Sequence, residues 1–245
     1  MTGYPAQTVL HDPASRQRRA AKILAILRQA LGEDLAASRA LDIGCASGLI
    51  TRYLAPHLRW IIGLEYDPQA VARADTAGQP HLLFVRGDAA HLPLADGAAD
   101  VVICAQVYEH VADPEAMVAE IARVLRPGGV CFFSGPNRWA LMEEHYRLPL
   151  LSWLPRPWAD RYVRLAGRGD AYRERPQSYW ALRRLWRGFE WQDYTLDMIR
   201  RPEAYHCAPE LGRLAWISRL PAGFLRALRP FYPNYNWILR KGVAE

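Results

Sequence analysis

Residues 40–52, ALDIGCASGLITR, constrain the fold more than any other stretch of this chain. An apolar run with a single acid, Asp42, ends at Gly44, small residues lead to Gly48, and an apolar pattern with helical spacing follows. This order predicts a strand, a tight turn and the first turn of a helix. Glycines let the backbone of such a turn approach a ligand closely, and the start of the helix offers unpaired N–H groups to it.

The segments around this turn alternate between strand-like apolar runs and helical spacing. Several runs are nearly continuous, which is typical of parallel strands covered on both faces. The alternation predicts an α/β fold with a doubly wound, Rossmann-like, mostly parallel sheet of seven strands. The expected strands are 40–43, 60–64, 82–85, 100–105, 130–133, 192–198 and 235–240, and the expected helices include 13–31 after the N-cap Asp12, 49–55, 69–77 and one after Asp113.

Charge and tryptophan content divide the chain into two unlike halves. Residues 138–245 hold 19 Lys and Arg against 11 Asp and Glu, whereas residues 1–137 hold 12 against 14, and eight of the nine tryptophans follow residue 137. A basic, Trp-rich half suits an anionic or amphipathic partner, although a solvated Arg-rich face over a Trp-packed subdomain explains it equally well.

The four cysteines and the absence of long apolar runs favour a cytoplasmic protein. The cysteines have no C-x-x-C spacing, and most lie in apolar or Gly-rich contexts, so we expect reduced, mostly buried thiols. No run approaches the roughly 20 apolar residues of a membrane span, and the N-terminus has no secretory signal pattern.

Glu65 directly follows the second expected strand, about 20 residues after the glycine turn. An acid at this place can accept two ribose hydroxyl protons. A dinucleotide would need G-x-G-x-x-G, but Gly44, Ala46 and Leu49 hold those positions. Asp42 would be unfavourable beside a pyrophosphate and favourable beside the ammonium of a methionyl group. The residues therefore favour S-adenosylmethionine over a dinucleotide.

These motifs resemble those of the class I S-adenosylmethionine-dependent methyltransferases, in particular the branch with ubiquinone and menaquinone methyltransferases. The matching segments occur in family order: the glycine turn at 41–48, the strand end GLEYDP at 63–68, the loop GDA at 87–89, the segment AQVYEHV at 105–111, and LRPGG at 125–129. They cover roughly residues 38–137. Ala46 departs from the family, which often has Gly there, and we expect slightly shifted cofactor contacts.

The resemblance implies a set of cofactor contacts. Glu65 would hold the ribose, Asp88 would accept from the adenine amino group, and Gln106 would lie near the sulfonium. The full set implied is Asp42, Gly44, Cys45, Ala46, Gly48, Glu65, Tyr66, Asp88, Ala89 and Gln106. Tyr66 would pack beside the adenine, and the backbone of Ala89 would donate to it.

These expectations divide the chain into four parts. An N-terminal helical segment covers 1–37, and the cofactor-binding core covers 38–137. A proline-rich cap insertion covers 138–177, and residues 178–245 complete the sheet and carry a helical insertion.

The reaction implied is direct displacement at the methyl group, helped by alignment and exclusion of water. Oxygen is the expected acceptor atom, and His110 and His145 are the candidate catalytic residues, with His110 the first candidate for a base. No metal is expected, because two or three ligands in one short segment do not make a site.

The expected acceptor is a small, amphipathic molecule of a lipid or glycan pathway, since the cap pairs Leu and Trp with Arg. The same segment leaves open a contact with a membrane surface. Two alternatives remain: a non-catalytic, cofactor-binding interaction protein, and an RNA-directed methyltransferase. Against nucleic acid, the loop after the fourth strand reads Ala-Gln-Val-Tyr instead of the Asn/Asp-Pro-Pro-aromatic loop of nucleic-acid amino methyltransferases.

Overall fold

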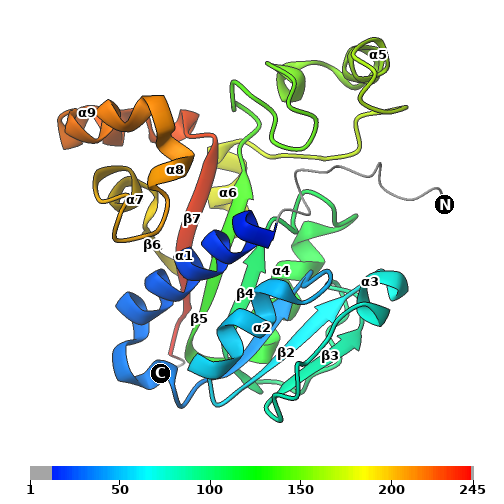
Figure 1. Ribbon diagram of the computed structural model, residues 1–245, viewed down its shortest axis with the longest axis vertical. Helices are drawn as coiled ribbons and strands as arrows, with labels where there is room; N and C mark the ends of the chain where they lie inside the picture. Colours follow the sequence, from blue (N-terminus) through cyan, green and yellow to red (C-terminus); the bar gives the residue numbers. More distant parts are fainter. Residues whose placement is uncertain (1–12, 244–245) are drawn as a thin grey trace.

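A seven-stranded sheet of order β3-β2-β1-β4-β5-β7-β6 forms the centre of the computed structural model, which describes residues 13–243 (Figure 1). The strands are β1 Arg39–Ile43, β2 Trp60–Glu65, β3 Leu82–Arg86, β4 Ala99–Ala105, β5 Leu125–Pro136, β6 Phe189–Asp193 and β7 Asn234–Lys241. Strands β1 to β5 pair in parallel, and β7 runs antiparallel to both of its neighbours. The mostly parallel α/β fold predicted from the sequence is therefore confirmed.

Six of the seven predicted strands lie where the sequence placed them, and the exception is 192–198. The sixth strand, β6, ends at Asp193, and a helix, α7 (Thr195–Arg200), follows at once. The Asp193 carboxylate accepts a hydrogen bond from the Thr195 backbone N–H at 2.9 Å. Because this bond satisfies a donor at the start of the helix, the apolar residues after Thr195 continue as a helix instead of a strand.

Helices cover both faces of the sheet, as the continuous apolar strands require. One face packs against α1 (Pro13–Leu31), α2 (Leu49–Leu54) and α7, and the other against α4 (Pro114–Val124) and α6 (Tyr179–Leu185). The short helix α3 (Pro68–Ala72) follows β2. The predicted N-cap of α1, Asp12, lies outside the described residues. The four cysteines are buried and unpaired, as expected.

The segment between β5 and α6 forms a cap with a small apolar core of its own. This core consists of Tyr146, Leu148, Leu151, Ala159, Val163 and Tyr172. The cap carries the helix α5 (Arg156–Leu165), which lies at one end of the molecule, beyond the end of β5 (Figure 1). Parallel strands β1 to β5 end at this edge, so the cap lies on the side of the sheet where doubly wound folds bind ligands.

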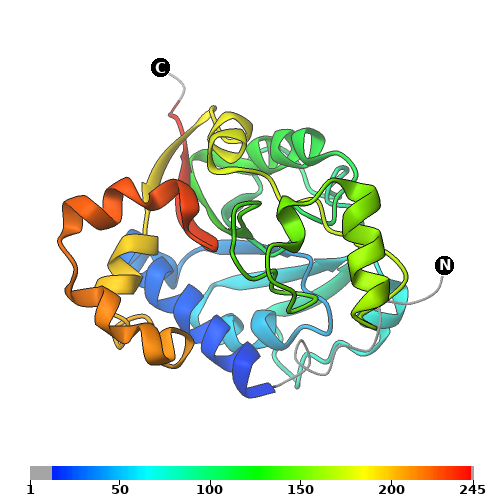
Figure 2. The same ribbon diagram turned by 90° about the horizontal axis from the view of Figure 1, so that it is seen from above.

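A second helical insertion separates α7 from β7. It contains α8 (Ala208–Leu211) and α9 (Ala222–Ala227), and seen from above it lies on the opposite side of the molecule from the cap (Figure 2). Among the helices of residues 13–243, none is both long and apolar enough to cross a lipid bilayer.

Candidate active site

The turn between β1 and α2 has left-handed backbone at three positions. The φ angles are +71° at Gly44, +51° at Ala46 and +76° at Gly48. The backbone N–H groups of Gly44 and Cys45 both donate to the carbonyl of Leu64, at 2.8 and 3.1 Å, which ties the start of the turn to β2. An alanine in the left-handed region costs about 1 kcal/mol, so Ala46 is held there by the surrounding turn.

Close packing explains why the turn needs glycine at both ends. A Cβ atom on Gly48 would overlap the ring of Phe84 from β3, and one on Gly44 would lie 2.7 Å from a methyl group of Val107. The same Phe84 ring lies against Gly63 of β2, where an added Cβ would be 2.6 Å away. Phe84 therefore supports the turn from below, a role that the sequence analysis missed because it depends on pairing between β2 and β3.

The carboxylate of Glu65 faces the glycine turn. One of its oxygens accepts a hydrogen bond from the Ala46 N–H at 2.9 Å, and the other accepts one from the Asp67 N–H at 2.9 Å. Glu65 is the last residue of β2 and is partly exposed. The two backbone donors fix the direction of the carboxylate beside the turn while leaving it open to solvent.

Asp42 lies beneath the turn and is buried, with 4% of its surface exposed. Its carboxylate accepts a hydrogen bond of 2.6 Å from the hydroxyl of Thr51 in α2. Burial, and to a smaller extent the negative charge of Glu65, raises the pKa of Asp42 to about 7, against the opposing hydrogen bond from Thr51. A cation near the turn would favour the ionised form of Asp42.

Two further predicted residues lie on the loops after β2 and β3. The ring of Tyr66 is 67% exposed directly after Glu65. Asp88 is exposed, and one of its oxygens accepts from the Ala90 N–H at 2.9 Å, while the neighbouring Ala89 is buried. Both loops lie at the carboxyl ends of adjacent strands, on the same edge as the glycine turn.

The loop after β4 begins with Gln106, which has a left-handed φ of +60°. Its backbone N–H donates to the Ser134 carbonyl at 2.8 Å, and its side-chain N–H donates to the Ser134 hydroxyl at 3.4 Å. The side-chain oxygen of Gln106 is buried and has no hydrogen-bond partner among residues 13–243. Such an orphaned acceptor is costly unless a ligand meets it.

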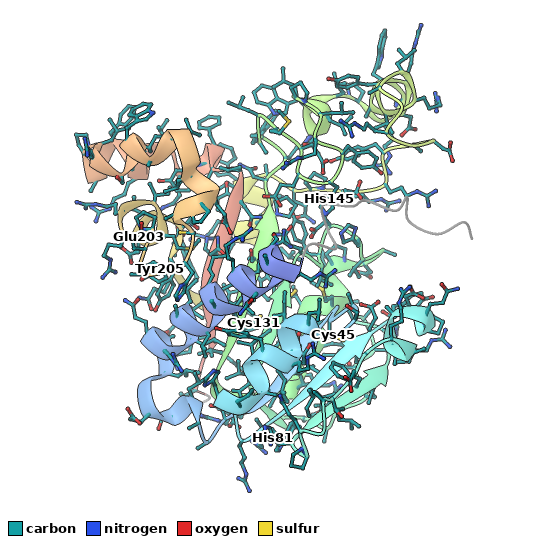
Figure 3. All side chains as sticks on the ribbon, in the orientation of Figure 1. Cys45, His81, Cys131, His145, Glu203 and Tyr205 are labelled. Atoms are coloured by element: carbon teal, nitrogen blue, oxygen red, sulfur yellow. The ribbon has the colours of Figure 1, made fainter. Side chains whose placement is uncertain are left out.

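The same loop ends at Glu109 and His110, which the structure brings together with His145 of the cap. The rings of His110 and His145 are 5.2 Å apart and perpendicular, and Nε2 of His110 is 3.8 Å from the Glu109 carboxylate. His145 is buried, and its Nδ1 lies 3.0 Å from the carboxylate of Glu143. Figure 3 shows His145 in the upper part of the molecule, well above Cys45.

Burial and charge shift the pKa values within this cluster. Burial raises the pKa of Glu109, and burial together with the neighbouring His145 lowers the pKa of His110. The pKa of His145 is raised: burial alone would lower it, but the hydrogen bond to Glu143 and the carboxylates around it outweigh burial. Only the two histidines of this cluster were predicted as site residues, and Glu109 and Glu143 were not, since the burial of an acid in a loop leaves no signature in a sequence.

Cys45 contributes its backbone to the turn, and its thiol is not a nucleophile. Burial, followed by the negative charges of Asp42 and Glu65, raises the pKa of Cys45 far above its usual range. A neutral thiol packed under the turn fits a structural role for this side chain.

Known proteins resemble the part of the chain that forms the carboxyl edge of the parallel strands. A family model described as a methyltransferase domain matches residues 41–133. A Mycolicibacterium smegmatis protein named "Probable S-adenosylmethionine-dependent methyltransferase" is 41% identical over 113 residues, covering 46% of this chain and 44% of that protein. A ubiquinone biosynthesis O-methyltransferase of Sodalis glossinidius is 36% identical over 102 residues, covering 40% of this chain and 41% of that protein.

Residues 41–133 match a methyltransferase domain and resemble S-adenosylmethionine-dependent methyltransferases. The methyltransferase resemblance predicted from the motifs is thus confirmed. The chain spans less than half the length of these two curated relatives. A crystal structure of an S-adenosylmethionine-dependent methyltransferase from Mesorhizobium loti shares the fold, with a TM-score of 0.59 and 18% identity, over 91% of this chain and 100% of that one.

The residues of the methyltransferase domain fit S-adenosylmethionine, the cofactor of this class. Glu65 presents an oriented carboxylate at the place where ribose hydroxyl groups need an acceptor. The orphaned oxygen of Gln106 and the buried carboxyl of Asp42 offer negative partial or full charge to a cationic methionyl group.

Proposed function

We propose that this chain transfers the methyl group of S-adenosylmethionine to an oxygen atom of a small, amphipathic acceptor. The observation that carries the proposal is the hydrogen bond between the Glu65 carboxylate and the Ala46 N–H, which joins the acid at the end of β2 to the glycine turn. When bound, the cofactor supplies a methyl group already activated by its sulfonium.

The proposed contacts follow from where the side chains lie. Glu65 accepts hydrogen bonds from the ribose hydroxyl groups, Tyr66 packs beside the adenine, and Asp88 accepts from its amino group. The backbone of Ala89 donates to the same ring, and Asp42 attracts the ammonium of the methionyl group. The proposed set also includes the backbone of Gly44, Cys45, Ala46 and Gly48, and the side chain of Gln106.

His110 and His145 are the residues that we propose to lie beside the acceptor oxygen. They lie on the loop after β4 and in the cap, so an acceptor held between the cap and the strand ends would meet both rings. Oxygen as the acceptor atom is supported by the relatives named ubiquinone biosynthesis O-methyltransferases.

The surface of the cap supports an amphipathic acceptor and contact with a membrane surface. Leu141, Trp158 and Leu165 are 70%, 64% and 77% exposed, and Trp158 and Leu165 share α5 with the arginines Arg156 and Arg164. Exposed apolar side chains beside arginines are typical of segments that lie in the headgroup region of a bilayer. The wild type should sediment with anionic vesicles, whereas most of a Trp158→Ala/Leu165→Ser double variant should stay in the supernatant. Equal sedimentation of both proteins would refute the contact.

Transfer of a labelled methyl group tests the proposed reaction. The purified chain is incubated with methyl-labelled S-adenosylmethionine and separate panels of phenols and quinol-type molecules, amines, and RNA. We expect label in the phenolic panel only. Cofactor binding without transfer to any acceptor would favour a non-catalytic interaction protein, and transfer to RNA with a steep salt dependence would favour an RNA-directed enzyme.

A further inference from the structure

Three side chains with metal-binding chemistry meet between the loop after β4 and the cap. Glu109 and His110 belong to the loop, and His145 belongs to the cap. One ligand atom from each residue lies within 4.8 Å of the others. No metal was expected from the sequence, because two or three ligands in one short segment do not make a site. The fold instead brings Glu109 and His110 together with His145 from a distant segment.

Glu109 is the strongest sign that something is bound here. It is 1% exposed, and both of its carboxylate oxygens are buried without a hydrogen-bond partner among residues 13–243. Burying a carboxyl group with no partner costs several kcal/mol. Native proteins retain such groups mainly where a ligand, an ion or a reaction needs them.

His145 is oriented by a carboxylate on the far side of its ring. Nδ1 lies 3.0 Å from Glu143, and the second oxygen of Glu143 accepts the Tyr146 backbone N–H at 2.6 Å. A histidine whose Nδ1–H donates to a carboxylate presents a lone pair on Nε2. This carboxylate–histidine arrangement is the usual outer support of a metal-ligating histidine.

The local charge also favours a cation. The buried carboxyl groups of Glu109, Glu143 and Glu174 all lie close enough to His145 to interact with its charge. Two imidazole nitrogens and one carboxylate oxygen suit zinc and the neighbouring first-row divalent ions better than magnesium, which prefers oxygen alone. Ligand atoms around a tetrahedral zinc are about 3.4 Å apart, so small side-chain rotations close the observed cluster onto an ion.

We propose that Glu109, His110 and His145 bind one divalent first-row transition metal ion of the zinc type. Three protein ligands leave a coordination position open, and an oxygen of the acceptor fits it. This use of the open position rests on the proposed function, whereas the metal site itself does not. An ion held by both the loop and the cap also fixes the cap over the site.

Metal binding in the absence of cofactor and acceptor tests this proposal. The chain is stripped with a chelator, then titrated with Zn²⁺ by calorimetry and with Co²⁺ by visible absorption. We expect one ion per chain and the d–d bands of four- or five-coordinate cobalt. Glu109→Gln should weaken binding at least about 100-fold, and Glu143→Gln about 10- to 100-fold.

Controls separate the site from surface binding and from unfolding. Asp170→Asn changes an exposed acid elsewhere in the cap and should leave metal affinity unchanged. In the wild type, NMR signals of only two of the seven histidine rings, those of His110 and His145, should shift on adding one equivalent of Zn²⁺. No saturable binding, or equal binding by the wild type and Glu109→Gln, would overturn the metal site while leaving the methyl-transfer proposal standing.

Discussion

The buried carboxyl group of Asp42 predicts that cofactor binding depends on pH. Its pKa of about 7 means that the free protein holds Asp42 mostly neutral below neutrality and ionised above it. Only the ionised form attracts the ammonium of the methionyl group. Affinity for S-adenosylmethionine or S-adenosylhomocysteine should therefore rise as pH rises through 7.

The pKa sets the size of the effect. The ionised fraction of Asp42 in the free protein falls from about 0.9 at pH 8 to about 0.1 at pH 6. If Asp42 is ionised whenever the ligand is bound, the Kd of the ligand should increase about tenfold from pH 8 to pH 6, which corresponds to about 1.4 kcal/mol. Thr51 and the thiols of Cys45 and Cys104 do not mimic this change, because Thr51 does not titrate and burial keeps the two thiols neutral.

Isothermal titration with S-adenosylhomocysteine at pH 6, 7 and 8 measures the effect, with Asp42→Asn as the matched variant. Asparagine still accepts a hydrogen bond from Thr51 but carries no charge. We expect the ratio of the Kd of Asp42→Asn to the Kd of the wild type to increase about tenfold from pH 6 to pH 8. Taking the difference between the two proteins cancels titration of the ligand's own amino group. Parallel pH profiles would refute the role given to Asp42.

Three further changes test the glycine turn and the ion pairs of Asp100 near the start of β4. Ala46→Gly should raise the free energy of unfolding in urea by up to about 1 kcal/mol, because it relieves a φ of +51°; a loss of stability would contradict the strain. Gly48→Ala should cost more than about 2 kcal/mol through overlap with Phe84, whereas Gly167→Ala, with a similar φ but no atom within 4 Å, should cost about 1 kcal/mol; equal losses would refute the overlap. Burial alone would raise the pKa of Asp100, but hydrogen bonds from arginines outweigh it and lower this pKa from 3.8 to about 2. The ionised carboxylate therefore stabilises the fold above pH 4, and this stabilisation is lost as pH falls towards 2. Asp100→Asn should cost about 2 kcal/mol at pH 7 and little at pH 2, and a loss of stability that does not depend on pH would contradict this linkage.

Local sequence patterns predicted the core of the fold because each motif acts within a few residues. The glycine turn, the acid after β2 and the Asp-Pro starts of α3 and α4 are fixed by backbone geometry and capping, which short sequences encode. The sixth strand was misplaced because the Tyr, Thr, Leu and Met residues of 192–198 fit a strand or a helix equally well over so few residues. Only the cap on Thr195 and the pairing with β7 decide where β6 ends.

The candidate site was predicted in part for the same reason. Glu65 ends β2 and Gln106 follows β4, so their place at the carboxyl edge of the sheet results from the order of the elements. The meeting of Glu109 with His145 could not be predicted, since it depends on how the cap folds around its own small core. The Trp-rich half also has two roles: Trp186 and Trp237 are buried in the core, whereas Trp158 is exposed.

The cofactor affinity of Glu65→Ala, compared with that of Arg168→Ala, tests the central claim most directly. Glu65 is proposed to accept two ribose hydrogen bonds, and a hydrogen bond to a charged group contributes about 1.5–3 kcal/mol. Isothermal titration should therefore show Kd for S-adenosylhomocysteine increased at least about 100-fold in Glu65→Ala and unchanged in Arg168→Ala, an exposed residue of the cap. Equal effects of the two substitutions, or no binding by the wild type at millimolar ligand, would contradict a cofactor site at the glycine turn.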